Sequence, residues 1–148
     1  MFPLRTFGGL FIGGAVFLAG FPFALVAGFA GEAAGGSVKD LQEHSQAMIK
    51  DAEDMVAHGG MGDAKAIVHH CHEVAKHAEA ILKAIPPADS HGKEATPHLQ
   101  EAIRQCQRVA KFGDKVDPGV TLNPGTKARA AVREAAKHIA AIKDEAAQ

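Results

Sequence analysis

The stretch EVAKHAEAILK at Glu73–Lys83 recurs in altered form as EAAKHIAAIK at Glu134–Lys143. A second pair, HSQAMIK at His44–Lys50 and HLQEAIR at His98–Arg104, repeats in the same order along the chain. The apolar residues of these regions recur three and four positions apart, which is the period of an amphipathic α-helix. The repeat therefore predicts two helical hairpins in tandem. Because one hairpin cannot bury its own apolar stripe, the two should close on each other as an antiparallel four-helix bundle.

Glycine and proline residues mark the expected ends of the helices. Asp63 and Thr96 are the expected N-caps of the second and third helices, and Pro86 is expected to stop the second. Residues 113–125 are expected to form a loop before the last helix. No stretch shows sustained strand-like alternation, so the predicted class is all-α. The four expected helices cover about 38–58, 63–85, 96–112 and 126 to near the C-terminus.

The N-terminal segment has a different composition from the rest of the chain. Thr6–Gly31 carries no charged residue, and a membrane-spanning helix needs about 20 such residues. Arg5 precedes this span and acidic residues follow it, so we expect the N-terminus in the cytoplasm and the remainder outside the inner membrane, in the periplasm. The alternative is a signal peptide cleaved near Ala30, which would leave a soluble periplasmic protein. The predicted organisation is an anchor or uncleaved signal segment at 1–31, a linker at 32–37 and the bundle at 38–148.

Two features bear on partners. Gly9 and Gly13 form a GxxxG pattern in the predicted membrane helix, and small residues let such a helix approach others closely. The membrane, and through this helix a larger membrane protein complex, are therefore the expected partners. The formal net charge is -1 with histidine neutral, which gives no electrostatic case for nucleic-acid binding.

Histidine is concentrated in VHHCHEVAKH at Val68–His77, which holds four of the nine histidines of the chain. An acidic residue also precedes a histidine by four positions in all four expected helices, which places both side chains on one face. A single pair of this kind only stabilises a helix, by a few tenths of a kcal/mol. Five such pairs indicate that the spacing serves a function. The pairs are Asp40–His44, Asp54–His58, Glu73–His77, Glu94–His98 and Glu134–His138.

The first two expected helices each carry a ridge of these residues beside the apolar stripe. The two ridges lie on the same rotational side, so in an antiparallel hairpin they either face each other or both face away. If they face each other, His44 is level with His77. Asp51 is then level with His70. Imidazoles and carboxylates in that number suit Cu(II) first, with Zn or Ni possible. The predicted ligands are His44, Asp51, His58, His70, Glu73 and His77.

His69 and His72 point away from these ridges and are candidates for a second, weaker metal site. The competing interpretation is that the histidines are solvated surface residues. We favour metal binding for the group, because a metal-free surface is more simply built from Lys, Glu and Gln.

The two cysteines, Cys71 and Cys106, both lie within apolar helical patterns, and the expected antiparallel packing puts them near the same level. In an exported protein this predicts a disulfide between them. The alternatives are a Cu(I) thiolate site with His72 or a methionine, and two buried free thiols.

The sequence HGGMGDAKAIVHHCHEVAKHAEAILKA at 58–84, followed by TPHLQEAI at 96–103, resembles the small metal-binding proteins of nitrifying bacteria. These are short, exported, histidine-rich four-helix bundles that bind copper and other divalent metals. The resemblance covers about residue 38 to the C-terminus, and its pattern is His58, Gly59, Gly62, His70 and His77. It implies metal binding in the first hairpin. The chain departs from the family at Asp63, where a further histidine is common, and in having cysteines within the predicted core.

These observations favour a membrane-anchored periplasmic metal-binding protein for metal buffering or delivery. The alternative is a structural accessory subunit of a membrane complex with no essential metal site. An enzyme is not expected, because the sequence shows no nucleophile with a base, no phosphate-binding glycine loop and no HExxH or Glu-x-x-His motif.

Overall fold

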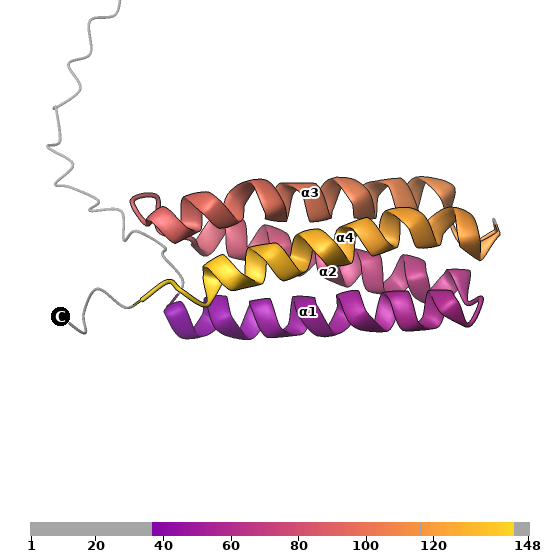
Figure 1. Ribbon diagram of the computed structural model, residues 1–148, viewed down its shortest axis with the longest axis horizontal. Coiled ribbons are helices and arrows are strands. Elements are labelled where there is room, and N and C mark those ends of the chain that lie inside the picture. Colours follow the sequence, from indigo (N-terminus) through magenta and orange to yellow (C-terminus); the bar gives the residue numbers. More distant parts are fainter. Residues whose placement is uncertain (1–36, 116, 144–148) are drawn as a thin grey trace, which may run out of the picture. The chain divides into compact units, whose positions relative to one another are not determined.

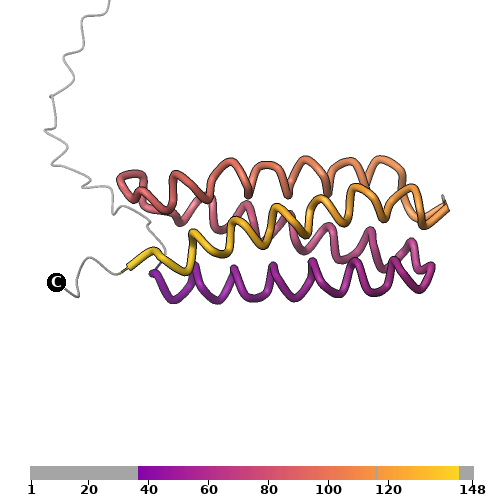
Figure 2. Tube along the Cα trace, in the orientation of Figure 1, coloured from indigo at the N-terminus to yellow at the C-terminus, as the bar shows by residue number. Residues whose placement is uncertain are grey.

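Four α-helices account for most of residues 37–115 and 117–143, which are the residues that the computed structural model describes. Successive helices run in opposite directions (Figures 1 and 2), so the predicted antiparallel four-helix bundle is confirmed. Helix α1 packs against α2 and α4, and α3 packs against the same two neighbours. The two hairpins of the repeat therefore lie side by side. The helices are α1 (Val38–Gly60), α2 (Ala64–Ala84), α3 (Ser90–Phe112) and α4 (Pro118–Ile139).

The first hairpin has the ends that the sequence predicts. Ser37 and Asp40 form a capping box at the start of α1, each side chain accepting a hydrogen bond from the other residue's backbone N–H at 3.1 Å. Asp63 caps α2 as predicted, because its carboxylate accepts the Ala66 N–H at 2.9 Å. Gly62, in the turn between the helices, has a φ of 85°, a conformation that glycine adopts without steric cost. The short turn holds α1 and α2 antiparallel and fixes their register.

Helix α3 begins six residues before the expected N-cap, so the predicted start at Thr96 is wrong. The true cap is Asp89, whose carboxylate accepts the Gly92 N–H at 2.7 Å. Gly92 is buried against the end of α2, where an added Cβ would lie 2.3 Å from Ile85 Cγ2. Pro97 is exposed within the helix. Packing of the turns before Pro97 thus stabilises helix in a segment where the proline alone predicts a helix start.

Helix α4 likewise begins well before the expected position, at Pro118 rather than near Thr126. Its N-cap is Asp117, which accepts the Gly119 N–H at 2.8 Å, and Pro118 occupies the first turn, where a proline is tolerated. Most of the predicted loop at 113–125 is therefore helical. Pro124 and Gly125, two residues that usually end a helix, are buried inside α4. Tertiary packing therefore keeps this segment helical.

The core is rich in alanine and in small aliphatic side chains. Leu41, Met48, Ile67, Ile81 and Leu99 are fully buried at 0% exposure. Eight alanines lie among them, which is consistent with closely packed helices: Ala52, Ala64, Ala78, Ala95, Ala102, Ala128, Ala131 and Ala135. Burial of this apolar surface is the main stabilising contribution to the bundle.

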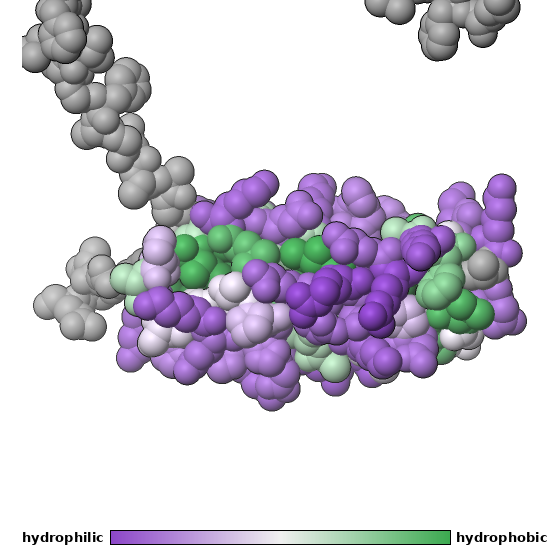
Figure 3. All heavy atoms as spheres, turned by 90° about the horizontal axis from the view of Figure 1, so that it is seen from above, coloured by the Kyte–Doolittle hydropathy of each residue, from purple (hydrophilic) through white to green (hydrophobic). Residues whose placement is uncertain are grey.

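The outer surface is mostly hydrophilic, as the view in Figure 3 shows, with apolar atoms visible along a line between helices and at one end. The exposed large apolar side chains of the described residues are Met61, Phe112 and Val120. They follow α1, end α3 and begin α4, so all three belong to the end of the bundle that carries the α1–α2 and α3–α4 connections.

The predicted anchor at 1–31 and all but the last residue of the predicted linker at 32–37 lie outside the described residues. Within the ranges that the structure describes, no helix has the length and the apolar character needed to cross a bilayer.

Candidate metal centres

Two imidazoles from different helices meet at the junction of α1 and α2. His44 Nδ1 and His77 Nδ1 are 3.0 Å apart, and the ring centroids are 5.3 Å apart with the planes tilted by 49°. The sequence placed these two residues at one level, and the structure brings them into contact. Both side chains are half-buried.

Asp51 extends this contact along the same junction. Its Oδ1 lies 3.0 Å from His70 Nδ1, and its Oδ2 lies 3.9 Å from His77 Nε2. Asp51 thus stands between two imidazoles of α2, each of which contacts a different carboxylate oxygen. The facing ridges that the sequence left as one of two possibilities are therefore the arrangement in the structure.

His58 completes the row at the turn end of the hairpin. Its ring lies against that of His70, with centroids 5.4 Å apart and planes 17° from parallel. We call this row the α1–α2 seam and define it as His44, Asp51, His58, His70 and His77.

Glu73, the sixth predicted ligand, takes a different direction. Its carboxylate accepts a hydrogen bond from Lys76 Nζ at 3.2 Å on the same helix. That ammonium group lowers the pKa of Glu73, with smaller lowering contributions from His72 and His69. Within the described residues Glu73 has no hydrogen bond or ion pair to the seam, so the structure places it with the outer face of α2.

His69 and His72, the candidates for a second site, are exposed on that outer face. The His69 ring lies 5.3 Å from the His70 ring, centroid to centroid. His69 therefore adjoins the seam from outside, whereas no ring contact involving His72 is found among the described residues.

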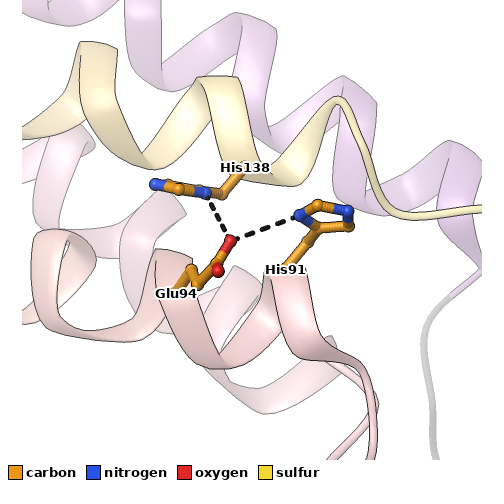
Figure 4. Close-up of side chains that lie close together, drawn as sticks. All are labelled: His91, Glu94 and His138. Atoms are coloured by element: carbon orange, nitrogen blue, oxygen red, sulfur yellow. Dashed lines mark ion pairs between the residues drawn. The ribbon is translucent and has the colours of Figure 1, made fainter.

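A second cluster lies between α3 and α4. Glu94 Oε2 is 3.0 Å from His138 Nδ1 and 3.3 Å from His91 Nδ1, and Figure 4 shows the carboxylate reaching between the two rings. Among the described residues, these three form the one set of histidine, cysteine or acidic side chains whose ligand atoms all lie within 4.8 Å of one another. The His98 ring stacks on His138 at a centroid distance of 5.7 Å. We call these four residues the α3–α4 cluster.

The sequence reasoning missed His91 and the role of Glu94 because it started the third helix at Thr96. Both residues then fell in an expected loop, where spacing carries no information about faces. The cap at Asp89 makes the segment helical, so that His91 and Glu94, three residues apart, lie on one face. An N-cap signal at Asp89, followed by this spacing, was present in the sequence.

The spacing of the donor atoms fits a small cation. Two donors bound to a tetrahedral ion at about 2.0–2.1 Å are about 3.3–3.4 Å apart, and in a square arrangement they are about 2.8–3.0 Å apart. The His44–His77 separation of 3.0 Å and the Glu94 separations of 3.0 and 3.3 Å fall in this interval. Without a cation, one nitrogen of the His44–His77 pair must carry a proton and donate it to the other.

The seam offers a carboxylate in a supporting position. If His77 held a metal through Nδ1, its Nε2 would be the ring nitrogen on the side of Asp51, 3.9 Å from Oδ2. A carboxylate behind a ligating imidazole fixes the orientation of the ring and increases its basicity. Asp51 also hydrogen-bonds His70, so one carboxylate lies beside two imidazoles.

The predicted disulfide is not formed, because Cys71 and Cys106 are both free and buried. Cys71 Sγ instead donates a hydrogen bond to Met55 Sδ at 3.2 Å. The contact with the Cys71 thiol and burial in the core raise the pKa of Cys106. Both cysteines are therefore buried free thiols, and the Cys71 thiol influences that of Cys106. His72 is exposed, so it does not join them in the core.

The bundle brings imidazoles and carboxylates of neighbouring helices together, an arrangement used by helical metal-binding proteins. The family model described as "Small metal-binding protein" matches residues 19–142. The chain therefore belongs to the small metal-binding protein family, as its sequence motifs suggested. No curated protein and no solved structure matches it.

Proposed function

We propose that the chain binds divalent metal ions, Cu(II) first, through the α1–α2 seam and the α3–α4 cluster, and that it buffers or delivers this metal. The observation that carries the proposal is the contact between His44 and His77. Two Nδ1 atoms 3.0 Å apart give a hydrogen bond of ordinary strength when metal-free, and they need little rearrangement to hold an ion together.

The donor set favours copper over harder cations. Imidazole nitrogen suits Cu, Zn and Ni, whereas Mg and Ca prefer sites made of oxygen ligands. Divalent copper binds a given nitrogen and oxygen site more tightly than the other first-row divalent ions. Zn and Ni are the second choices for the same ligands.

The seam is expected to bind more tightly than the α3–α4 cluster. Its side chains are more shielded from water, with Asp51 and His77 each 20% exposed. In the cluster, Glu94 is 57% exposed and His91 is 45% exposed. Shielding strengthens the attraction between a cation and a carboxylate, and it lowers the number of conformations that the ligands must give up.

We further propose that the bundle works in the periplasm, held to the inner membrane by the uncharged segment Thr6–Gly31. A tethered buffer would keep metal close to membrane proteins that use it. The basis for this part is the sequence alone, namely the length of the uncharged span and the single arginine before it.

Calorimetric titration of the full chain with Cu(II) tests the binding proposal. We expect binding at micromolar or tighter dissociation constants, and loss of the tightest phase in the variant H44A/H77A. The matched control is H69A/H72A, which removes the same number of imidazoles from exposed positions and should leave that phase in place.

Equal loss in both variants would show nonspecific binding by surface histidines. No binding in the wild-type chain would leave the structural accessory role as the remaining candidate. Because protons compete with metal ions for a ligand imidazole, the affinity should also fall in acidic solution.

A further inference from the structure

Three sulfur atoms from three helices meet in the centre of the bundle. Cys71 Sγ of α2 lies 3.2 Å from Met55 Sδ of α1, and the Cys71 thiol raises the pKa of its buried neighbour Cys106 of α3. All three side chains are almost completely buried, at 0% exposure for Met55, 1% for Cys71 and 3% for Cys106. Sulfur is thus gathered at one point of a core that is built mostly from aliphatic groups.

This sulfur group is distinct from the imidazole sites. Its members lie on the apolar stripes of their helices and belong to the hydrophobic core, whereas the seam residues flank those stripes. The buried polar residues among the described ones are Ser45, Gln105 and Thr121. None of these brings a carboxylate to the core, so the charged oxygen ligands that a hard cation prefers are absent from the described part of the core.

We propose that Met55, Cys71 and Cys106 form a buried binding site for Cu(I). Thiolate and thioether sulfur are the soft ligands that select this ion. Binding replaces the protons of the two thiols, which leave to solvent, and copper stays in the +1 state, so no oxidant or reductant takes part. The methionine supplies a third, uncharged donor.

The surroundings of Met55 leave it free to adapt. Gly125 of α4 faces the methionine sulfur, and a Cβ added there would lie 3.4 Å from Met55 Sδ. An alanine at this position would touch the thioether at ordinary van der Waals distance, whereas a larger side chain would crowd it. The three rotatable bonds of methionine, together with this small neighbour, let the sulfur turn towards an ion held by the two thiolates.

Burial of the two thiols accounts for their resistance to oxidation and is compatible with Cu(I) binding. Burial and the neighbouring thiol disfavour ionisation of Cys106, and since the thiolate is the reactive form, the pair is protected from oxidation. A soft cation that enters the core offsets this cost by direct bonds to sulfur. Metal binding is therefore coupled to release of protons, and Cu(I) uptake should weaken as the pH is lowered.

The test uses the full chain, reduced and kept free of oxygen, titrated with Cu(I) in competition with a chromophoric Cu(I) chelator. We expect one tightly held Cu(I) with the ultraviolet charge-transfer absorption of Cu–thiolate bonds. The variant C71A/C106A should lose both. M55L should lower the affinity by about tenfold, the scale of losing one partner at a metal site, whereas the matched variant M48L, another fully buried methionine of α1, should not.

The H44A/H77A variant separates this site from the imidazole sites, since it should keep Cu(I) uptake while losing tight Cu(II) binding. The proposal is overturned if the wild-type chain shows no charge-transfer band under these conditions, or if M48L and M55L behave alike. Circular dichroism of each variant confirms that it is folded. Recovery of Cys71 and Cys106 as a disulfide that resists reductant would likewise overturn it.

Discussion

In the first hairpin the rings of His44 and His77 lie 5.3 Å apart, and in the second those of His98 and His138 lie 5.7 Å apart. The pairs are equivalent in the internal repeat, because the offset of 54 takes His44 to His98 and the offset of 61 takes His77 to His138. Each hairpin thus brings one imidazole of its first helix against one of its second. The repeat preserves a pairing between helices as well as an apolar stripe.

The hairpins differ beyond this shared pair. The same offsets take Asp51 to Gln105 and His70 to Ala131, so the second hairpin lacks the carboxylate and imidazole that extend the first. Gln105 donates to Glu101, which lowers the pKa of Glu101. Its Oε1 is buried with no hydrogen-bond partner in the described part of the chain. A neutral amide stands where the first hairpin has a carboxylate that lies beside two rings.

The second hairpin has two further metal-ligand residues beside its His98–His138 pair, and the first hairpin has none at the equivalent positions. His91 and Glu94 in the early turns of α3 reach towards His138 (Figure 4). Their repeat equivalents in the first hairpin are Ser37 and Asp40, which form the capping box of α1. One structural position is therefore used for capping in one hairpin and for metal-ligand residues in the other.

The largest effect is expected where the hairpins share a core. Leu99 is fully buried, and truncation in L99A should lower the free energy of unfolding by about 2–5 kcal/mol through lost burial and a cavity. Chemical denaturation followed by circular dichroism measures this. The adjacent exposed variant Q100A is the control and should change little. Two separate transitions in L99A, one for each hairpin, would contradict a single shared core.

The difference between the seam and the second hairpin can be removed by substitution. D51Q/H70A gives the first hairpin the residues found at the equivalent positions of the second. Because an orienting carboxylate and a nearby imidazole are both lost, the Cu(II) affinity of the tightest site should fall by about 10–100-fold. Calorimetric titration measures the change. D54Q, at a residue that pairs with Lys50 on the same helix, is the control, and an equal fall there would count against a specific role for Asp51.

The early start of α3 is expected to depend on its cap. D89A removes the acceptor for the Gly92 N–H, and such a loss typically costs about 1 kcal/mol of stability. Binding at the α3–α4 cluster should weaken with it, because His91 and Glu94 lie in the affected turns, while the seam should be unchanged. D89N, which keeps a good capping group, should restore both properties. A D89A chain with unaltered cluster binding would show that packing alone holds these turns.

The smallest effect is expected at the ion pairs that join the hairpins on the surface. Glu53 of α1 lies 2.7 Å from Arg133 and 3.4 Å from Arg129, both of α4. These groups are partly exposed, so E53Q should cost only about 0.2–1 kcal/mol, and less at high salt. Thermal unfolding at low and high salt measures this. E43Q, which breaks a pair within α1, should cost less.

Much of the first hairpin was predictable because its capping residue, turn glycines and histidine spacing all indicate the same structure. Asp63 as a cap, glycines at the turn and histidines seven apart all point to one register, and the turn length then sets His44 against His77. The second hairpin was less predictable because Pro97 and Pro124 lie inside helices. Local propensity argues against a helix at these points, and only the buried neighbours that form in the folded bundle reverse it.

The contacts of the sulfur atoms could not be predicted from the sequence for a different reason. Sequence spacing placed Cys71 and Cys106 at one level, but whether two neighbouring thiols form a disulfide depends on distances and angles that spacing does not fix. The contact of Cys71 with Met55 is likewise invisible in the sequence, because it requires the relative rotation of α1 and α2.

Pulsed electron paramagnetic resonance of the full chain loaded with one equivalent of Cu(II) tests the central claim most directly, since it counts the imidazoles bound to the ion. We expect couplings from two imidazole nitrogens in the wild-type chain, and from fewer in H44A, with the H98A spectrum unchanged. A wild-type spectrum that H44A and H77A both leave unaltered would contradict the claim that the paired histidines of the first hairpin hold the metal.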